Sequence, residues 1–66
     1  MTVTINGTPR DLPSGVTLAD AVGQLTQSPK GVAAALNGEV VPRRAWPATP
    51  LAERDQVEVV TAVQGG

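Results

Sequence analysis

The feature that most constrains the fold of this 66-residue chain is a pair of Asn-Gly dipeptides, at positions 6–7 and 37–38. Asparagine and glycine both tolerate the positive φ angles of a two-residue turn, so each dipeptide predicts a β-hairpin. Around the first turn, Thr2–Asn6 alternates polar and apolar residues, and Thr8–Leu12 returns as the second strand. Because proline cannot donate to a ladder, Pro9 places this second strand at the edge of a sheet.

One helix is predicted between the two hairpins. Thr17 is a good N-cap, and Asp20, three residues later, nearly completes a capping box. Apolar residues follow at helical spacing and form one face: Leu18, Ala21, Val22 and Leu25. Gly23 weakens the helix by up to ~1 kcal/mol relative to alanine, and we expect it there to allow close packing on the sheet. Ser28–Gly31, which contains a proline, ends the helix.

The second hairpin joins Val32–Leu36 to Glu39–Val41. The alanines of Val32–Leu36 favour a helix, but the run is short and leads directly into an Asn-Gly turn, so we predict a strand. Beyond it, Arg43–Pro50 contains two further prolines and is expected to be irregular, with one short turn of helix. Leu51 then returns the chain to the core.

The last strand, Gln56–Val63, is the most apolar of the five. Its period of two places Val57, Val59 and Val63 on one face and Glu58, Val60 and Ala62 on the other. We expect it at the centre of the sheet, parallel to the first strand, where its ladder is paired on both sides. The sequence thus predicts one α+β domain over residues 1–63, with a mixed five-stranded sheet packed on one helix in the order ββαβββ.

Composition argues against several classes of function. The chain has no cysteine and no histidine, which rules out disulfides and the common thiolate or imidazole metal sites, so no metal site is predicted. A net charge of −1 is not the basic footprint of a nucleic-acid-binding protein. No segment approaches the ~20 apolar residues that span a bilayer, and no signal peptide is recognisable, so the expected location is cytoplasmic.

The side chains offer little catalytic chemistry. Carboxylates are scattered over turns and exposed positions, namely Asp11, Asp20, Glu39, Glu53, Asp55 and Glu58. No histidine base, cysteine nucleophile or phosphate-binding glycine pattern accompanies them. We therefore expect that the chain is not itself an enzyme.

The C-terminal stretch Gln64-Gly65-Gly66 permits two interpretations. It is either a frayed tail, as most termini are, or a flexible arm, residues 64–66, whose carboxylate is the reactive group. An α-carboxylate is ionised at neutral pH and can attack the α-phosphate of a nucleotide to give an acyl adenylate. A sulfur nucleophile can then attack the acyl carbon and displace the nucleotide. Glycines lack Cβ atoms and can thread a narrow channel, and this arm reaches roughly 10 Å beyond the strand.

The chain also resembles the ThiS family, the ubiquitin-like sulfur carriers of thiamine (thiazole) biosynthesis, over nearly its whole length. The resemblance is carried by Leu36-Asn37-Gly38-Glu39-Val40-Val41-Pro42-Arg43, Trp46, Leu51, Asp55 and the run from Val57 to Gly66. A terminal Gly-Gly alone indicates only a ubiquitin-like protein, whereas the Asn-Gly-Glu-Val-Val-Pro-Arg motif with its downstream tryptophan indicates this family. One departure is Arg54-Asp55, where the family usually has Gly-Asp.

The resemblance implies a β-grasp fold and a sulfur-transfer cycle. A ubiquitin-activating-type adenylyltransferase, ThiF-like, would use ATP and Mg to adenylate Gly66, with Gly65 and Gln64 serving recognition of the tail. Sulfur from a cysteine desulfurase, or from another donor, would convert the adenylate to a thiocarboxylate, and a ThiG-like thiazole synthase would accept it. The chain itself would bind no cofactor and would be a monomer when free. Because it lacks cysteine, the terminal carbonyl is the position left to carry sulfur.

Other residues have two interpretations each. Val60 and Ala62 are expected to face outward on the open side of the sheet beside the tail, and they are candidates for docking partner proteins. Trp46 is interpreted as filling the edge of the core, with partner contact as the alternative. Arg43 and Arg44 are interpreted as a solvated pair, with a docking role as the alternative.

Two other functions compete with the thiazole pathway. One is a sulfur-carrier subunit of another pathway, such as the small subunit of molybdopterin synthase, a family that shares the fold and the Gly-Gly end but is usually longer. The other is a ubiquitin-like protein modifier, in which Gly66 would end in an amide on a partner lysine.

Overall fold

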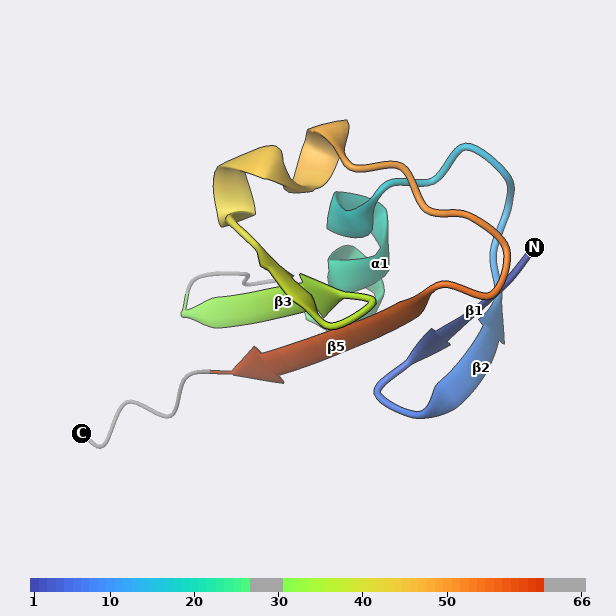
Figure 1. Cartoon of the computed structure of the whole chain (residues 1–66), viewed down its shortest axis with the longest axis horizontal. Helices are drawn as coiled ribbons and strands as arrows, with labels where there is room; N and C mark the ends of the chain where they lie inside the picture. Colours follow the sequence, from blue (N-terminus) through green and yellow to red (C-terminus); the bar gives the residue numbers. More distant parts are fainter. Residues whose placement is uncertain (27–30, 62–66) are drawn as a thin grey trace.

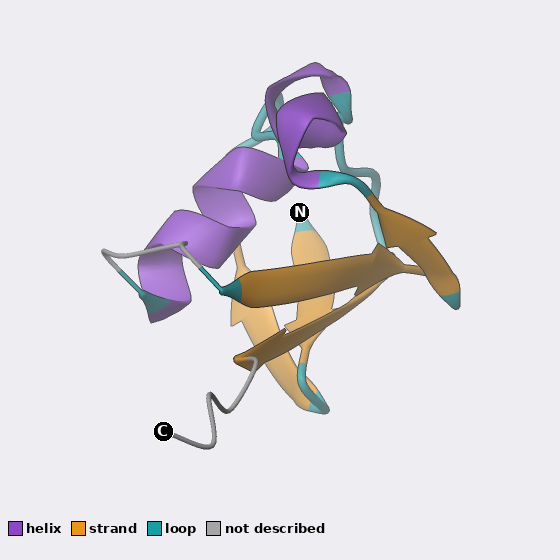
Figure 2. Cartoon of the chain, turned by 90° about the vertical axis from the view of Figure 1, so that its left-hand side faces the viewer, coloured by secondary structure: helices purple, strands orange, loops and turns teal. Residues whose placement is uncertain are grey.

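The structure is a computed structural model, and it describes residues 1–26 and 31–61. A five-stranded sheet in the order β2-β1-β5-β3-β4 carries helix α1 on one face (Figures 1 and 2). A 3₁₀ helix, η1, lies between β4 and β5 and packs against α1. In chain order the elements are β1 Thr2–Ile5, β2 Thr8–Asp11, α1 Leu18–Leu25, β3 Val32–Leu36, β4 Glu39–Val41, η1 Arg43–Ala48 and β5 Gln56–Thr61. The predicted α+β class and the order of its elements are confirmed.

Both predicted Asn-Gly hairpin turns are present. Asn6 and Gly7 have φ angles of 51° and 81°, and Asn37 and Gly38 have φ angles of 52° and 87°. All four therefore lie in the left-handed region that such turns require. The first turn pairs β1 with β2, which lies at the edge of the sheet as its proline predicted, and the second pairs β3 with β4.

Strand β5 lies at the centre of the sheet, as predicted. It runs parallel to β1 through the pairs Thr4↔Gln56 and Ile5↔Val57. On its other side it runs antiparallel to β3 over five pairs, from Leu36↔Val57 to Val32↔Thr61. The longest strand of the domain is therefore bonded along both edges, which makes it the most firmly held part of the sheet.

Helix α1 begins as the sequence predicted. The Thr17 N–H donates to Asp20 Oδ2 at 2.8 Å, and the Asp20 N–H donates to Thr17 Oγ1 at 3.4 Å, which completes the capping box. The helix buries its first three apolar positions on the sheet, and the core consists of Val3, Ile5, Leu12, Leu18, Ala21, Val22, Val32, Ala34, Trp46, Leu51, Val57 and Val59. Leu25, the fourth position of the predicted apolar face, lies in the last turn and is exposed.

The interpretation of Gly23 as a packing glycine is wrong. The residue is exposed, and a Cβ placed on it would meet no atom within 4 Å other than its own helix and chain neighbours. Its backbone is part of the regular helix Leu18–Leu25. Gly23 therefore weakens α1 without a compensating close approach to the sheet.

We expect Gly23→Ala to stabilise the protein by about 1 kcal/mol, because alanine restricts the unfolded chain and favours the helix. The melting temperature should rise by about 4–8 °C for a domain of this size. Gly38→Ala is the matched control: it makes the same substitution at a φ angle of 87°, where a Cβ is strained, and should destabilise. Urea unfolding followed by circular dichroism measures both variants, and a less stable Gly23→Ala protein would contradict this account.

The proline-containing segment after β4 is more regular than predicted. It forms a six-residue 3₁₀ helix, Arg43–Ala48, in place of one short turn. Trp46 projects from it into the core, where it is 3% exposed, and its Nε1–H donates to the Val41 carbonyl oxygen at 2.8 Å. The interpretation of Trp46 as a core residue is confirmed, because the indole both packs and satisfies its only donor.

The turn before β5 holds a left-handed arginine. Arg54 has a φ angle of 70°, in the region that glycine favours, so the turn keeps a glycine-like conformation although the residue is arginine. This backbone strain costs about 1–2 kcal/mol. The Arg54 N–H donates to the Thr2 carbonyl oxygen at 2.7 Å, which ties the turn to β1.

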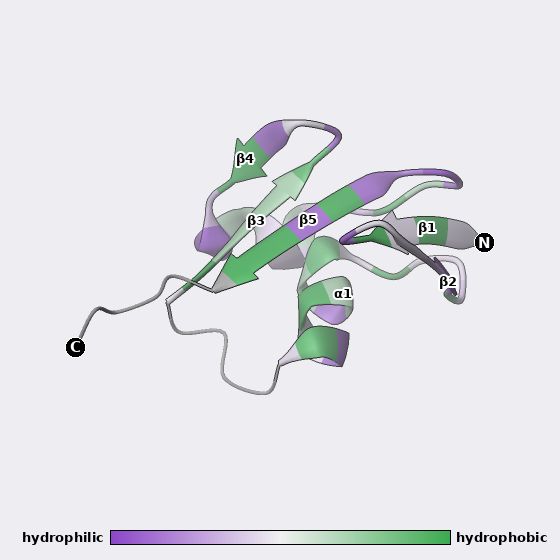
Figure 3. Cartoon of the chain, turned by 90° about the horizontal axis from the view of Figure 1, so that it is seen from below, coloured by the Kyte–Doolittle hydropathy of each residue, from purple (hydrophilic) through white to green (hydrophobic). Residues whose placement is uncertain are grey.

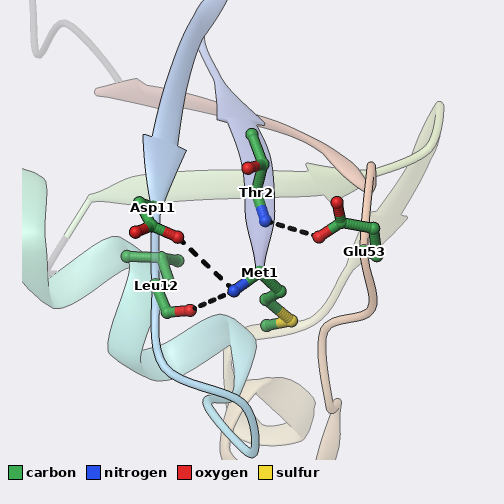
Figure 4. Close-up of polar contacts among 5 residues, drawn as sticks. All are labelled: Met1, Thr2, Asp11, Leu12 and Glu53. Carbon is green, nitrogen blue, oxygen red and sulfur yellow. Dashed lines mark hydrogen bonds and ion pairs between the residues drawn. The ribbon is translucent and has the colours of Figure 1, made fainter.

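The beginning of β1 is bonded on both sides (Figure 4). The Met1 amino group donates to the Leu12 carbonyl oxygen at 2.8 Å and lies 3.4 Å from Asp11 Oδ1. On the other side, the Thr2 N–H donates to Glu53 Oε1 at 2.6 Å. These contacts fasten the edge hairpin to the turn that leads into β5.

Candidate functional site

The described end of β5 has the two faces that the sequence predicted. Val57 and Val59 are buried toward α1, whereas Glu58 and Val60 are exposed on the opposite, open face of the sheet. Val60 is 61% exposed, which is unusual for a valine in a central strand. The predictions for Val63 and Ala62 lie outside the described residues.

Asn6 holds β5 beyond the point where β1 ends. The Asn6 N–H donates to the Val57 carbonyl oxygen at 2.9 Å, which continues the parallel ladder. Its side chain then reaches the next residue of that edge: Oδ1 accepts the Val59 N–H at 2.7 Å, and Nδ2 donates to the Val59 carbonyl oxygen at 3.0 Å. A side-chain amide here takes the place of a strand residue, so both backbone groups of Val59 are satisfied.

Asn37, in the second Asn-Gly turn, holds the other end of the same strand. Its Oδ1 accepts the Gln56 N–H at 2.9 Å, and its Nδ2 donates to Asp55 Oδ1 at 3.0 Å. The second carboxylate oxygen of Asp55 accepts the Ala52 N–H at 2.7 Å, which closes the preceding turn. The two asparagines therefore anchor β5 at its start and near its end, a role that could not be seen in the sequence, where both residues indicated only turns.

A shallow groove of about 340 Å³ lies on the open face of the sheet beside the end of β5. Figure 3 shows hydrophobic residues at this end of β5, next to β3 and with β4 beyond it. Val40, on edge strand β4, is 77% exposed and borders the groove together with Val60. The groove is lined by Asn6, Ala33, Ala34, Ala35, Val40, Glu58, Val59 and Val60.

Cross-strand register explains the shape of this groove. Ala35 pairs with Val40 on one side and with Glu58 on the other, and Ala33 pairs with Val60. Small alanine side chains on β3 are thus flanked by larger side chains on both neighbouring strands, which leaves a hollow along β3. Glu58 adds one carboxylate to an otherwise apolar and amide surface.

The other candidate residues are not part of this groove. Arg43 and Arg44 are exposed at the start of η1, consistent with a solvated pair. Gln64, Gly65 and Gly66 lie outside the described residues, so their roles stay predictions. Within residues 1–26 and 31–61, no group of three acidic residues is placed to hold a metal ion, and neither helix is long and apolar enough to cross a membrane.

A mixed five-stranded sheet that grips one helix, with the last strand at its centre beside the first, defines a ubiquitin-like β-grasp domain. The sequence narrows this class further, because the family model of the ThiS family matches residues 3–66. The chain belongs to the ThiS family.

Relatives from two organisms agree with this membership. Over 64 residues, the chain is 42% identical to a protein of Thermus thermophilus named sulfur carrier protein ThiS, and the match covers 97% of this chain and 98% of that one. The crystal structure of the thiamine biosynthesis protein ThiS from Geobacter metallireducens superposes with a TM-score of 0.83 at 30% identity, over the full length of both chains. A solution structure from the same organism gives a TM-score of 0.77 and is covered over 88% of its length.

Proposed function

We propose that this protein is a sulfur carrier of thiamine biosynthesis, and that its C-terminal carboxylate, at Gly66, is adenylated and converted to a thiocarboxylate that supplies sulfur to the thiazole. The observation that carries the proposal is the match to the ThiS family model, which extends to residue 66. A relative that is 42% identical and named as a sulfur carrier supports it. The geometry is consistent with it, since β5, whose chain leads to Gly66, is anchored at its start by Asn37 and near its end by Asn6.

The chemistry requires only a carboxylate from this chain. An oxygen of the Gly66 carboxylate attacks the α-phosphorus of ATP, and pyrophosphate leaves with an acyl adenylate formed. Attack of sulfide on the carbonyl carbon then expels AMP and leaves the thiocarboxylate. A persulfide donor would instead expel AMP to give an acyl disulfide. A second thiol must then attack the donor's sulfur atom, which forms a disulfide with the donor and releases the thiocarboxylate. ATP, Mg and the catalytic side chains belong to the partner enzymes, so the carrier contributes a reactive end and the surface by which it is held.

Three partners follow from this proposal. A ubiquitin-activating-type adenylyltransferase, ThiF-like, forms the adenylate; a cysteine desulfurase is an indirect source of sulfur; and a ThiG-like thiazole synthase consumes the thiocarboxylate. All partners that act on the tail must approach the same end of β5. The open-face groove beside Val60 is the surface that we assign to this docking, and Ala62 belongs to the same proposal from its sequence position.

Intact mass spectrometry tests the proposal. The purified chain is incubated with the adenylating partner, Mg-ATP and a sulfur source. Replacement of one oxygen by sulfur at the C-terminus is the expected result, and omission of ATP should prevent it. A product that carries a whole partner protein through an amide would instead indicate a protein modifier. An unchanged mass, with a partner that loads a known carrier in parallel, would refute the sulfur-carrier proposal.

Val60→Asp is expected to raise the Kd for the adenylating enzyme at least about tenfold, since it places a second carboxylate, beside Glu58, on the mainly apolar docking surface. The side chain is exposed, so the free energy of unfolding should change little. Gln24→Glu, which makes the same change of charge on the exposed side of α1, is the control and should bind as the parent does. Calorimetric titration measures both, and parental affinity in Val60→Asp would show that the groove is not the docking surface.

A further inference from the structure

The support of β5 is unequal on its two sides near its C-terminal end. On the β3 side, backbone pairing continues to Val32↔Thr61. On the β1 side, the last backbone hydrogen bond runs from the Asn6 N–H to the Val57 carbonyl oxygen, and within the described residues the Asn6 side chain is the farthest contact along that edge. The last hydrogen bonds on this side thus come from a single side-chain amide, that of Asn6, which is 53 positions away from Val59 in the sequence.

We propose that Asn6 is a positioning residue for the C-terminal carboxylate: its two hydrogen bonds to Val59 fix the end of β5 from which the reactive arm continues. This inference rests on the proposed sulfur-carrier function. Asn6 also lines the open-face groove, so the same side chain joins the docking surface to the strand that carries the arm. It touches none of the reacting atoms and acts through Val59.

The length of chain between the last fixed residue and Gly66 determines how often the carboxylate reaches a partner's active site. When a partner binds the sheet, the local concentration of the carboxylate in its active site falls with the −3/2 power of the free arm length, or more steeply. Loss of the Asn6 bonds leaves the N–H and C=O of Val59 without these partners, so beyond Val57 the end of β5 is held by its pairing with β3 alone. An end held on one side frays more often, and the free arm is longer whenever it does. The carboxylate then reaches its attacking position in a smaller fraction of complexes.

The second Asn-Gly turn supplies a matched control. Asn6→Gly and Asn37→Gly each remove one β5-anchoring amide, and glycine accepts the φ angles of 51° and 52° without strain. The Asn6 bonds lie at the end of β5 that leads to Gly66, whereas the Asn37 bonds lie at Gln56 and Asp55, where the strand begins. A purely structural role predicts equal consequences for the two variants, and a positioning role predicts unequal ones.

We expect Asn6→Gly to lower kcat for thiocarboxylate formation about twofold at nearly unchanged KM for the carrier, while Asn37→Gly retains the parental kcat. Hydrogen exchange of the free protein gives a second readout: the Val59 amide should exchange about tenfold faster in Asn6→Gly than in the parent, because its acceptor is lost. Asn6→Asp keeps the oxygen that accepts the Val59 N–H but replaces the Nδ2 donor to the Val59 carbonyl by a second oxygen. Its kcat should therefore lie between those of the parent and Asn6→Gly.

These results separate the inference from the function on which it rests. Failure of the parent chain to gain sulfur would refute the proposed function, whereas Val59 exchange depends on no partner. Equal kcat values for Asn6→Gly, Asn37→Gly and the parent would overturn the positioning role. So would a loss of kcat that Asn37→Gly shares to the same degree. Assays below the unfolding transition of each variant, located by circular dichroism, keep the comparison between folded proteins.

Discussion

Trp46→Ala is expected to lower the free energy of unfolding by about 3–5 kcal/mol, the usual cost of truncating a buried aromatic residue. The indole is 3% exposed and is the only aromatic side chain of the protein, so no neighbouring ring can fill the space it leaves. A domain of 66 residues has a total stability of about 3–10 kcal/mol. The variant should therefore lose about a third or more of the free energy of unfolding.

Trp46→Phe separates the packing of the indole from its hydrogen bond. Phenylalanine keeps most of the buried surface but leaves the Val41 carbonyl oxygen without the Nε1–H donor, at a cost of roughly 1 kcal/mol beyond the loss of volume. Urea unfolding followed by far-ultraviolet circular dichroism measures both variants, because tryptophan fluorescence is lost in each. A Trp46→Ala protein within about 1 kcal/mol of the parent would show that Trp46 is dispensable to the core.

The architecture could be predicted because each element carries a local signal. The Asn-Gly dipeptides fix two hairpins, Thr17 and Asp20 fix the start of α1, and the alternation in Gln56–Thr61 fixes which face of β5 is buried. Once these are assigned, the most apolar strand has one favourable position, the centre of the sheet. Local periodicity and turn chemistry thus determine this small fold almost completely.

Features that depend on contacts between distant residues could not be predicted. Asn6 and Val59 are 53 positions apart, and Asn37 lies 19 positions from Gln56, so nothing in either turn indicates that its amide binds β5. The open-face groove requires the registers of three strands at once, because Ala35 lies between Val40 and Glu58. Gly23 shows the converse error: a glycine in a helix suggested close packing, although no close contact exists there.

Deletion of Gly66 is expected to reduce sulfur loading at least about 100-fold while the protein stays folded. The shortened chain still ends in a glycine carboxylate, Gly65, so the chemical group is unchanged. Its reach is shorter by one residue, about 3.3–3.6 Å, and a misplacement of even 1 Å at a reacting atom can cost about 100-fold in rate. The variant therefore tests the position of the carboxylate and not its presence.

Gly66→Ala is the companion variant, because it restores the length of the arm and its carboxylate and adds only a Cβ atom. If the partner's channel admits glycine alone, this variant should also load slowly, although both should bind the adenylating enzyme through the sheet as the parent does. Among the described residues, the buried core runs from Val3 to Val59, so neither change should alter stability. Intact mass after incubation with the partner, Mg-ATP and a sulfur source measures loading. A deletion variant that gains sulfur at the parental rate would place the reactive position elsewhere than Gly66.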